Sequence, residues 1–312
     1  MATTNTIPDH YVVQFDTNWK LAVQQVLERL RRVVTVRTGC SGRAVTHNRI
    51  EKEEMEEQTE RLQTTTGTEL TTEKRWVFPR PHQKTTYIDE WDADLLGQTV
   101  LPTGDAVRVH AAASARKMDK IIIDGLDGNN YTGSGNEEAI TATAFASGQK
   151  IAITFDYDSA VSQSLSLDKL IATKSKFGTD EVYGQDQRYM GDVMVIAVNQ
   201  NMLDNLLRAT QLTSADYASV KALVEGEISH FMGFEFVRTE QLPANAAATG
   251  YLSYAWVKSH VKLDVWADFK SRMSIRDDLS EAIQIRSKLM AGSTYDQNEA
   301  VVQIDCKTLA SA

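Results

Sequence analysis

The chain has 312 residues, a formal net charge of −9, 42% hydrophobic residues and 24% charged residues. This length allows one elaborated domain or two ordinary ones around a large core, and no apolar run approaches the roughly 20 residues that cross a bilayer. The acidic total argues against a protein that grips nucleic acid through a broadly basic surface. Cys40 and Cys306 are too few for a disulfide framework.

The chemistry-bearing residue types are scattered. The first residues, MATTNTIPDHYVV, contain neither a basic n-region nor an apolar h-region, so we expect the chain to stay in the cytoplasm of the cell that makes it. The six histidines have no metal-ligand spacing and there is no Cys-x-x-Cys motif. We therefore expect no metal site and no cofactor.

The N-terminal part places a basic segment before an acidic one. Apolar residues between Trp19 and Val34 follow helical spacing and predict an amphipathic helix with its arginines on the other side. The stretch from Glu51 to Glu60 is rich in glutamate and contains a single lysine. Both segments are either solvated faces or contacts between subunits. The contact interpretation pairs these residues: Arg29, Arg31 and Arg32 with Glu53 and Glu54 of the same or an adjacent subunit.

The next part of the chain lacks a core pattern. From Thr35 to Thr72 the sequence is rich in Thr, Gly, Glu and Arg, which predicts an extended excursion without a buried core of its own. Lys74 to Ile88 has strand character, but Pro79 and Pro81 exclude a central strand and favour an edge or a projecting hairpin arm. The cations of this arm are further candidate assembly contacts: Lys74, Arg75 and Arg80.

The strongest predicted helix covers Thr103 to Asp124. One apolar stripe runs along it at spacings of three and four residues, and at about 1.5 Å per residue it forms a rod on the order of 30 Å long. Gly125 and Gly128 are predicted to end it, and Asp127 to Gly135 is predicted to be an exposed loop.

The C-terminal half predicts alternating strands and helices. A strand covers Lys150 to Phe155, and a helix capped by Ser166 or Asp168 extends to Lys176. A buried strand over Asp192 to Val198 then leads into an Asn-capped helix over Asn199 to Ala209.

The next elements are a helix over Tyr217 to Val224, which Gly226 stops, and a strand over Phe234 to Arg238, which is entered through Gly233 and closed by Leu242-Pro243. The segment from Ala255 to Val265 is ambiguous. The chain ends with a long alternating strand over Asp277 to Ala291, a turn over Gly292 to Asn298 and a closing strand over Ala300 to Ile304.

Three groups resemble catalytic or ligand-binding sites only superficially. His110 has no nucleophile motif nearby and is predicted to lie on the helix surface. Asp156 and Asp158 lack the other ligands of a calcium loop, so a turn at a strand end explains them better. The glycine-rich stretch from Gly125 follows a helix instead of opening one, which excludes a phosphate-binding loop.

The order of these elements resembles that of tailed-bacteriophage major capsid proteins with the Hong Kong 97 fold, from Asn18 to Asp305. Five stretches carry the resemblance: Gln24 to Val34 is similar to the helix of their N-terminal arm, Ala111 to Leu126 to their spine helix, Leu165 to Lys176 to their next long helix, Tyr217 to Pro243 to a helix, turn and strand of their axial domain, and Ala282 to Ile304 to the long paired strands of their peripheral domain.

This resemblance implies an α+β fold in five parts. An N-terminal arm (1–46) precedes an extended loop (47–95) that reaches over a neighbouring subunit. A peripheral domain (96–163 and 273–312) holds the spine helix and long strands, and an axial domain (164–272) faces the centre of the capsomer. A loop that is poor in core-forming residues gains order by lying on another chain.

The implied function is that of the major subunit of an icosahedral phage head around double-stranded DNA. Its expected partners are further copies of itself in hexamers and pentamers, a separate scaffolding protein, a portal and a decoration or cement protein. The protein would be made in the host cytoplasm, reside in the virion and have no membrane partner. An acidic wall suits DNA that must not adhere to it. The alternatives are an encapsulin-like nanocompartment shell and a hydrolase that uses Asp156, Asp158 or His110.

Overall fold

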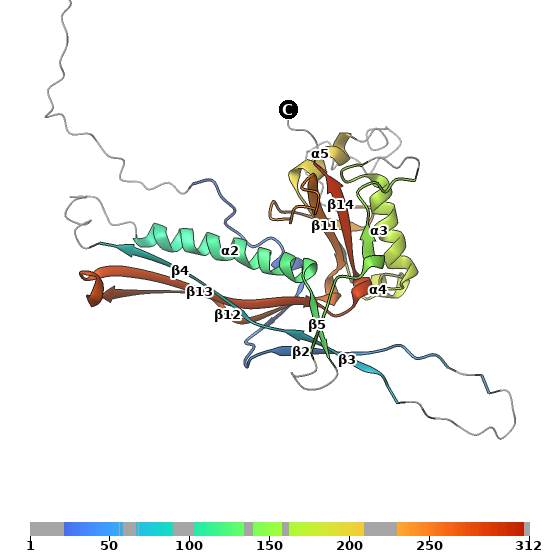
Figure 1. Ribbon diagram of the computed structural model, residues 1–312, viewed down its shortest axis with the longest axis horizontal. Helices are drawn as coiled ribbons and strands as arrows, with labels where there is room; N and C mark the ends of the chain where they lie inside the picture. The colour runs from blue at the N-terminus through green and yellow to red at the C-terminus, as the bar shows by residue number, and fades with distance from the viewer. Residues whose placement is uncertain are drawn as a thin grey trace, which may run out of the picture.

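The computed structural model describes residues 22–55, 57–58, 67, 69–89, 103–133, 140–157, 162–208 and 230–308. The predicted helix over Tyr217 to Val224, its stop at Gly226 and Asp158 lie outside the described residues. Three sheets organise the described part of the chain. Figure 1 shows an elongated half, in which one long helix lies along a sheet, and a second half in which another sheet stands beside shorter helices.

The elongated half is built on a four-stranded sheet. In spatial order its strands are β1 (Thr35–Thr38), β12 (Val261–Arg276), β13 (Ala282–Tyr295) and β4 (Arg80–Ile88). β12 and β13 form a long antiparallel hairpin whose tip contains η6 (Asp277–Leu279). Residues 285, 287, 289 and 291 of β13 are buried while 286 and 288 are exposed. This alternation confirms the predicted two-faced strand from Ala282 onward. The prediction is wrong over residues 277–281, which form the turn at the hairpin tip.

Helix α2 (Thr103–Asp127) covers one face of this sheet along β13 (Figure 1). The predicted stripe is buried at Ala115, Met118 and Ile122. The helix passes through Gly125 and ends at Asp127. A Cβ at Gly125 would lie 2.8 Å from the Ser293 carbonyl oxygen. Gly125 therefore lets the helix approach β13 closely.

A second four-stranded sheet contains the predicted excursion. Its strands are β2 (Val45–Ile50), β3 (Thr72–Val77), β5 (Asn130–Gly133) and β6 (Thr141–Thr143). β2 and β3 pair as the two sides of a hairpin, so part of the segment predicted to lack regular structure is stranded. The predicted loop after α2 is wrong over β5, which pairs with β3 and buries Asn130. In the first four-stranded sheet, β4 lies at an edge, as Pro81 requires.

The six-stranded sheet forms the other half. Its order is β7 (Lys150–Ile151), β14 (Val301–Lys307), β11 (Gly250–Val257), β8 (Met194–Val198), β10 (Phe234–Arg238) and β9 (His230–Phe231). The helices of this half are α3 (Leu167–Thr179), α4 (Gln185–Tyr189) and α5 (Gln200–Arg208), and short 3₁₀ turns are η1 (Arg31–Val33), η3 (Ser147–Gln149), η5 (Lys258–His260) and η7 (Asn298–Ala300). The strand predicted over Lys150 to Phe155 is confirmed only at β7.

The predicted helix caps are confirmed. The Ser166 side chain accepts a hydrogen bond from the Lys169 backbone N–H, and the Asn199 Oδ1 accepts one from Met202 at 2.9 Å. These side chains satisfy N–H groups that the first helical turn leaves unpaired. Strand β8 before the second cap is buried throughout, as its apolar run predicts.

The two C-terminal strands do not pair with each other. β13 pairs with β12 and β4, whereas β14 pairs with β11 and β7. The turn between them begins after Tyr295, not at Gly292. The expectation that Ala282 to Ile304 forms mutually paired strands is therefore wrong. This segment joins the two halves of the molecule.

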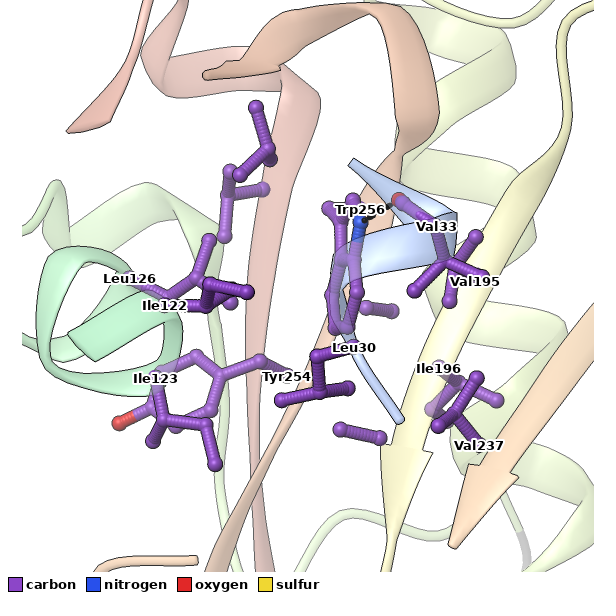
Figure 2. Packing of buried hydrophobic residues seen from close by; sticks show 14 of the residues in the cluster. Leu30, Val33, Ile122, Ile123, Leu126, Val195, Ile196, Val237, Tyr254 and Trp256 are labelled. Atoms are coloured by element: carbon purple, nitrogen blue, oxygen red, sulfur yellow. Dashed lines mark hydrogen bonds between the residues drawn. The ribbon is translucent and has the colours of Figure 1, made fainter. Parts of the chain in front are cut away.

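The predicted N-terminal helix is also wrong over residues 22–34. Apart from η1 the chain there has no helix, and it lies between α2 and the six-stranded sheet. Helical spacing and tertiary burial compete here, and burial prevails because Leu30 and Val33 are fully enclosed at 0% and 1% exposure. Figure 2 shows Leu30 beside Tyr254 and Trp256, and Val33 beside Trp256 and Val195.

Candidate functional site

The arm segment, which we define as residues 22–34, is held by a buried carboxylate in the middle of α2. Asp119 is 0% exposed and its Oδ1 accepts hydrogen bonds from the backbone N–H groups of Arg29 (3.1 Å) and Leu30 (3.0 Å). Burial raises the pKa of Asp119, and the hydrogen bonds from Leu30, Arg29 and Gln25 oppose that rise. The carboxylate thus satisfies N–H groups at the start of η1, as a capping side chain would.

The same segment packs into the core beyond this contact. The Trp256 indole Nε1 donates to the Val33 carbonyl oxygen at 3.0 Å (Figure 2). Val33 lies near Val195 of the six-stranded sheet, and Leu30 lies between α2 and that sheet. The arm segment therefore joins the two halves of its own subunit.

The predicted contact arginines of this segment have partners within the subunit. Arg31 Nη1 lies 3.1 Å from a Glu28 carboxylate oxygen, and Arg31 Nη2 lies 2.8 Å from Asp268. The hydrogen bond from Arg31 lowers the pKa of Asp268, and the bond to Asp268 raises the pKa of Arg31. This ion pair fastens η1 to β12.

Arg29 contacts the last residue of β10, and Arg32 contacts the second. Arg29 Nη1 donates to the Arg238 carbonyl oxygen at 3.0 Å. Arg32 Nη2 lies 3.4 Å from Glu235, and its side chain is 67% exposed. Both contacts are polar and lie near the surface, so they add less than the buried leucine and valine of the same segment.

The acidic segment, which we define as residues 51–57, has a different environment. Glu53 and Glu54 are exposed, as are Glu51 and Glu57. It continues from β2 away from the body of the molecule (Figure 1). Within one subunit the structure does not bring Glu53 or Glu54 to the three arginines. A contact between these groups in adjacent subunits stays a prediction.

The three cations predicted on the hairpin arm differ in burial. Arg75 is 2% exposed; its Nη2 lies 3.4 Å from Glu73 and donates to Asn298 Oδ1 at 3.3 Å. Its Nε and Nη1 have no protein partner among the described residues. Lys74 is half-buried and Arg80 is exposed. Their role in assembly stays a prediction.

Sequence reasoning did not single out a cationic surface on the β12–β13 hairpin. The four residues of this basic face are Lys270 and Arg272 of β12 and Arg286 and Lys288 of β13, all exposed. Lys270 pairs with Lys288 and Arg272 with Arg286 in the strand register. The alternation of basic residues within each strand is visible in the sequence, but only the strand register brings the four cations together.

The residues considered for catalysis have structural contacts. His110 is 3% exposed and not on the surface as predicted; its ring nitrogens lie 2.8 Å from Thr86 Oγ1 and 2.9 Å from Ser287 Oγ. Burial lowers its pKa. Asp156 accepts a hydrogen bond from Gln163. In the described ranges no group of three or more His, Cys, Asp or Glu is placed to hold a metal ion, and no described helix is long and apolar enough to cross a membrane.

The sequence matches a family model described as phage capsid protein over residues 7–308. The chain belongs to the phage capsid protein family. It is a structural protein of the viral shell, and its place is the capsid of the virion. The predicted identity as a phage major capsid protein is thereby confirmed. A search of curated proteins found no match.

Solved phage capsids share the fold at low sequence identity. The capsid of Cyanophage Pam1 matches with a TM-score of 0.70 and 8% identity, covering 99% of this chain and 100% of that one. The capsid of Cyanophage P-SCSP1u gives 0.69 and 16%, covering 96% and 94%. A chain of Mycobacterium phage Che8 gives 0.64 and 17%, covering 97% and 98%. The expected α+β, Hong Kong 97-type fold is confirmed.

Proposed function

We propose that this capsid protein assembles as hexamers and pentamers into an icosahedral phage head that encloses double-stranded DNA. The observation that carries this proposal is the β2–β3 hairpin, whose acidic segment extends from a body that already has its own core (Figure 1). A segment with exposed side chains gains order by lying on another copy. Repetition of such contacts in a closed shell gives stability that a single contact lacks.

The division into parts remains a proposal, which the strand pairing helps to refine. The starting division has residues 1–46 as the arm, 47–95 as the extended loop, 96–163 and 273–312 as the peripheral domain, and 164–272 as the axial domain, and we propose it with two changes. Because β12 pairs along β13 and β14 pairs along β11, we propose that β12 belongs with the peripheral part and β14 with the axial part.

The further partners are inferred from the role in the shell. They are a scaffolding protein, a portal, a decoration or cement protein, and packaged DNA held without sequence-specific contacts. Synthesis in the host cytoplasm follows from the same role. The net charge of −9 supports an inner wall that repels DNA. Predominantly basic residues on the lumen side would contradict this part of the proposal.

The direct test is negative-stain microscopy of the purified protein, with analytical ultracentrifugation of the same sample. We expect closed particles, or capsomers of five and six copies, without added enzyme substrate. A compact monomer under all assembly conditions would contradict the proposal. Particles that enclose protein cargo and no DNA when made in the native host would favour a nanocompartment shell.

A further inference from the structure

The basic face lies on the side of the four-stranded sheet that α2 leaves uncovered. Ser287 bonds to His110 of α2 and to Ser271, so residues 271 and 287 point toward the helix. Alternation along each strand then places residues 270, 272, 286 and 288 on the opposite side. All four side chains are exposed.

The arrangement of these cations is unfavourable for a sheet without a ligand. Lys270 lies opposite Lys288, and Arg272 lies opposite Arg286. Like charges directly opposite in a sheet repel. Arg286 Nη2 donates to Gln83 Oε1 at 2.9 Å, but in the described part of the chain none of the four has a carboxylate within ion-pair distance. An anionic partner would remove this repulsion.

The acidic segment of the same chain carries negative charge that complements the basic face. Glu51, Glu53, Glu54 and Glu57 are exposed and likewise have no ion pair within the described residues. In an extended segment, residues two apart are separated by roughly 6.7 Å, which is also the spacing of residues 270 and 272 along β12. Carboxylates of the acidic segment can therefore meet successive cations of the basic face.

The acidic segment does not reach the basic face of its own subunit. Ile50 pairs with Thr72 at the end of the hairpin next to its loop, and β3 and β4 then run toward Gln83, which pairs with Lys288. Along the chain this path is about 36 Å long at about 3.3 Å per residue, and Figure 1 shows β3 and β4 running in one general direction. Residues 51–57 span at most about 25 Å. Figure 1 shows the loop-side ends of β2 and β3 and the β12–β13 tip on opposite sides of the molecule.

The edge of the basic face favours a short protein segment over nucleic acid. Exposed Asp277, Asp278 and Glu281 occupy the hairpin tip beside it, so a long polyphosphate backbone would run from the cations onto like charges. We propose that the basic face binds the acidic segment of a second copy of this chain. This inference rests on the proposed self-assembly and names the residues of one contact in it.

A peptide assay tests the contact without requiring particles. The probe is a labelled peptide with the sequence of residues 51–60, and the control peptide has Gln in place of each Glu. We expect the full-length chain to bind the probe, and R272E/R286E to bind it at least roughly tenfold more weakly. The matched control R188E/K307E changes two other exposed cations and should bind like the wild type. Equal binding by wild type and R272E/R286E would overturn the inference.

Charge exchange identifies the occupant. A peptide with Lys at the positions of Glu51 and Glu53, which share one side of an extended segment, should bind R272E/R286E better than it binds the wild type. R272E/R286E/E51K/E53K should assemble where each double variant fails. Failure of this rescue would overturn the inference, as would tighter binding of a short DNA duplex than of the probe. If the charge reversal prevents folding, R272Q/R286Q replaces it in the binding assay, because it removes the repulsion between the two arginines. Wild-type protein that binds the probe but forms no particles would contradict the proposed function and leave this contact supported.

Discussion

The arm segment and the acidic segment are both charged stretches of the sequence, but the structure uses them in opposite ways. The arm segment buries Leu30 and Val33 and attaches to Asp119, Asp268 and Trp256 of its own subunit. The acidic segment exposes its glutamates. A few apolar side chains decide the difference, because burial of apolar surface offsets the entropy of ordering and solvated glutamates do not.

The largest expected effect lies in the arm segment. Leu30→Ala removes a fully buried side chain between α2 and the six-stranded sheet, and should lower the free energy of unfolding of the subunit by about 2–5 kcal/mol. The matched control is Leu27→Ala, since Leu27 is 76% exposed in the same segment. Urea unfolding of both variants checks this, and equal losses would show that the arm segment does not belong to the core.

A substitution at Gly233 tests the backbone geometry of the six-stranded sheet, against which the arm segment packs. Its φ is +92° at the entry to β10, and a Cβ there would lie 3.1 Å from Met194 Cε. Gly233→Val should cost roughly 1 kcal/mol or more, because a β-branched residue is strained at positive φ. Thermal unfolding measures it, with Gly148→Val as a control where a Cβ meets no neighbour. An unchanged melting temperature would contradict the strained entry.

We expect a smaller effect on stability from the ion pair between Arg31 and Asp268. Asp268 has a pKa lowered from 3.8 by Arg31, so its contribution is present above that value and is lost as the pH falls through the lowered pKa. Because the pair is partly exposed, we expect at most about 0.5 kcal/mol. Unfolding curves of wild type and Asp268→Asn between about pH 2 and pH 5 should converge at the acid end. Parallel curves would mean that the ion pair adds nothing.

The smallest expected effect lies in the acidic segment. Met55 is fully exposed, so Met55→Ala should change the free energy of unfolding of the unassembled subunit by less than about 0.5 kcal/mol. Chemical unfolding before assembly gives this value. A loss of several times that size would place the segment on its own subunit and remove the contrast with the arm segment.

The sequence predicts the elements whose signals are local. The stripe of α2, the caps Ser166 and Asn199, the buried strand β8 and the edge position of β4 each follow from periodicity, side-chain capping or proline chemistry. These features depend on neighbours in the chain, and so they are readable before the fold is known.

The misses depend on contacts between distant segments. The arm segment has helical spacing, but Asp119 lies about 90 residues further on and supplies the acceptors that replace helical hydrogen bonds. The separation of β13 from β14 and the pairing of β5 with β3 are likewise set by remote partners. The basic face needs the register of β12 against β13, which composition does not reveal.

Hydrogen–deuterium exchange on unassembled and assembled protein tests the central claim most directly, namely that the arm segment completes the subunit and the acidic segment is ordered by a neighbour. We expect the amide of Leu30, which donates to Asp119, to be protected in both states. Amides of residues 51–57 should exchange rapidly in the free subunit and become protected on assembly. Protection of the acidic segment before assembly, or no change in it afterwards, would contradict the account.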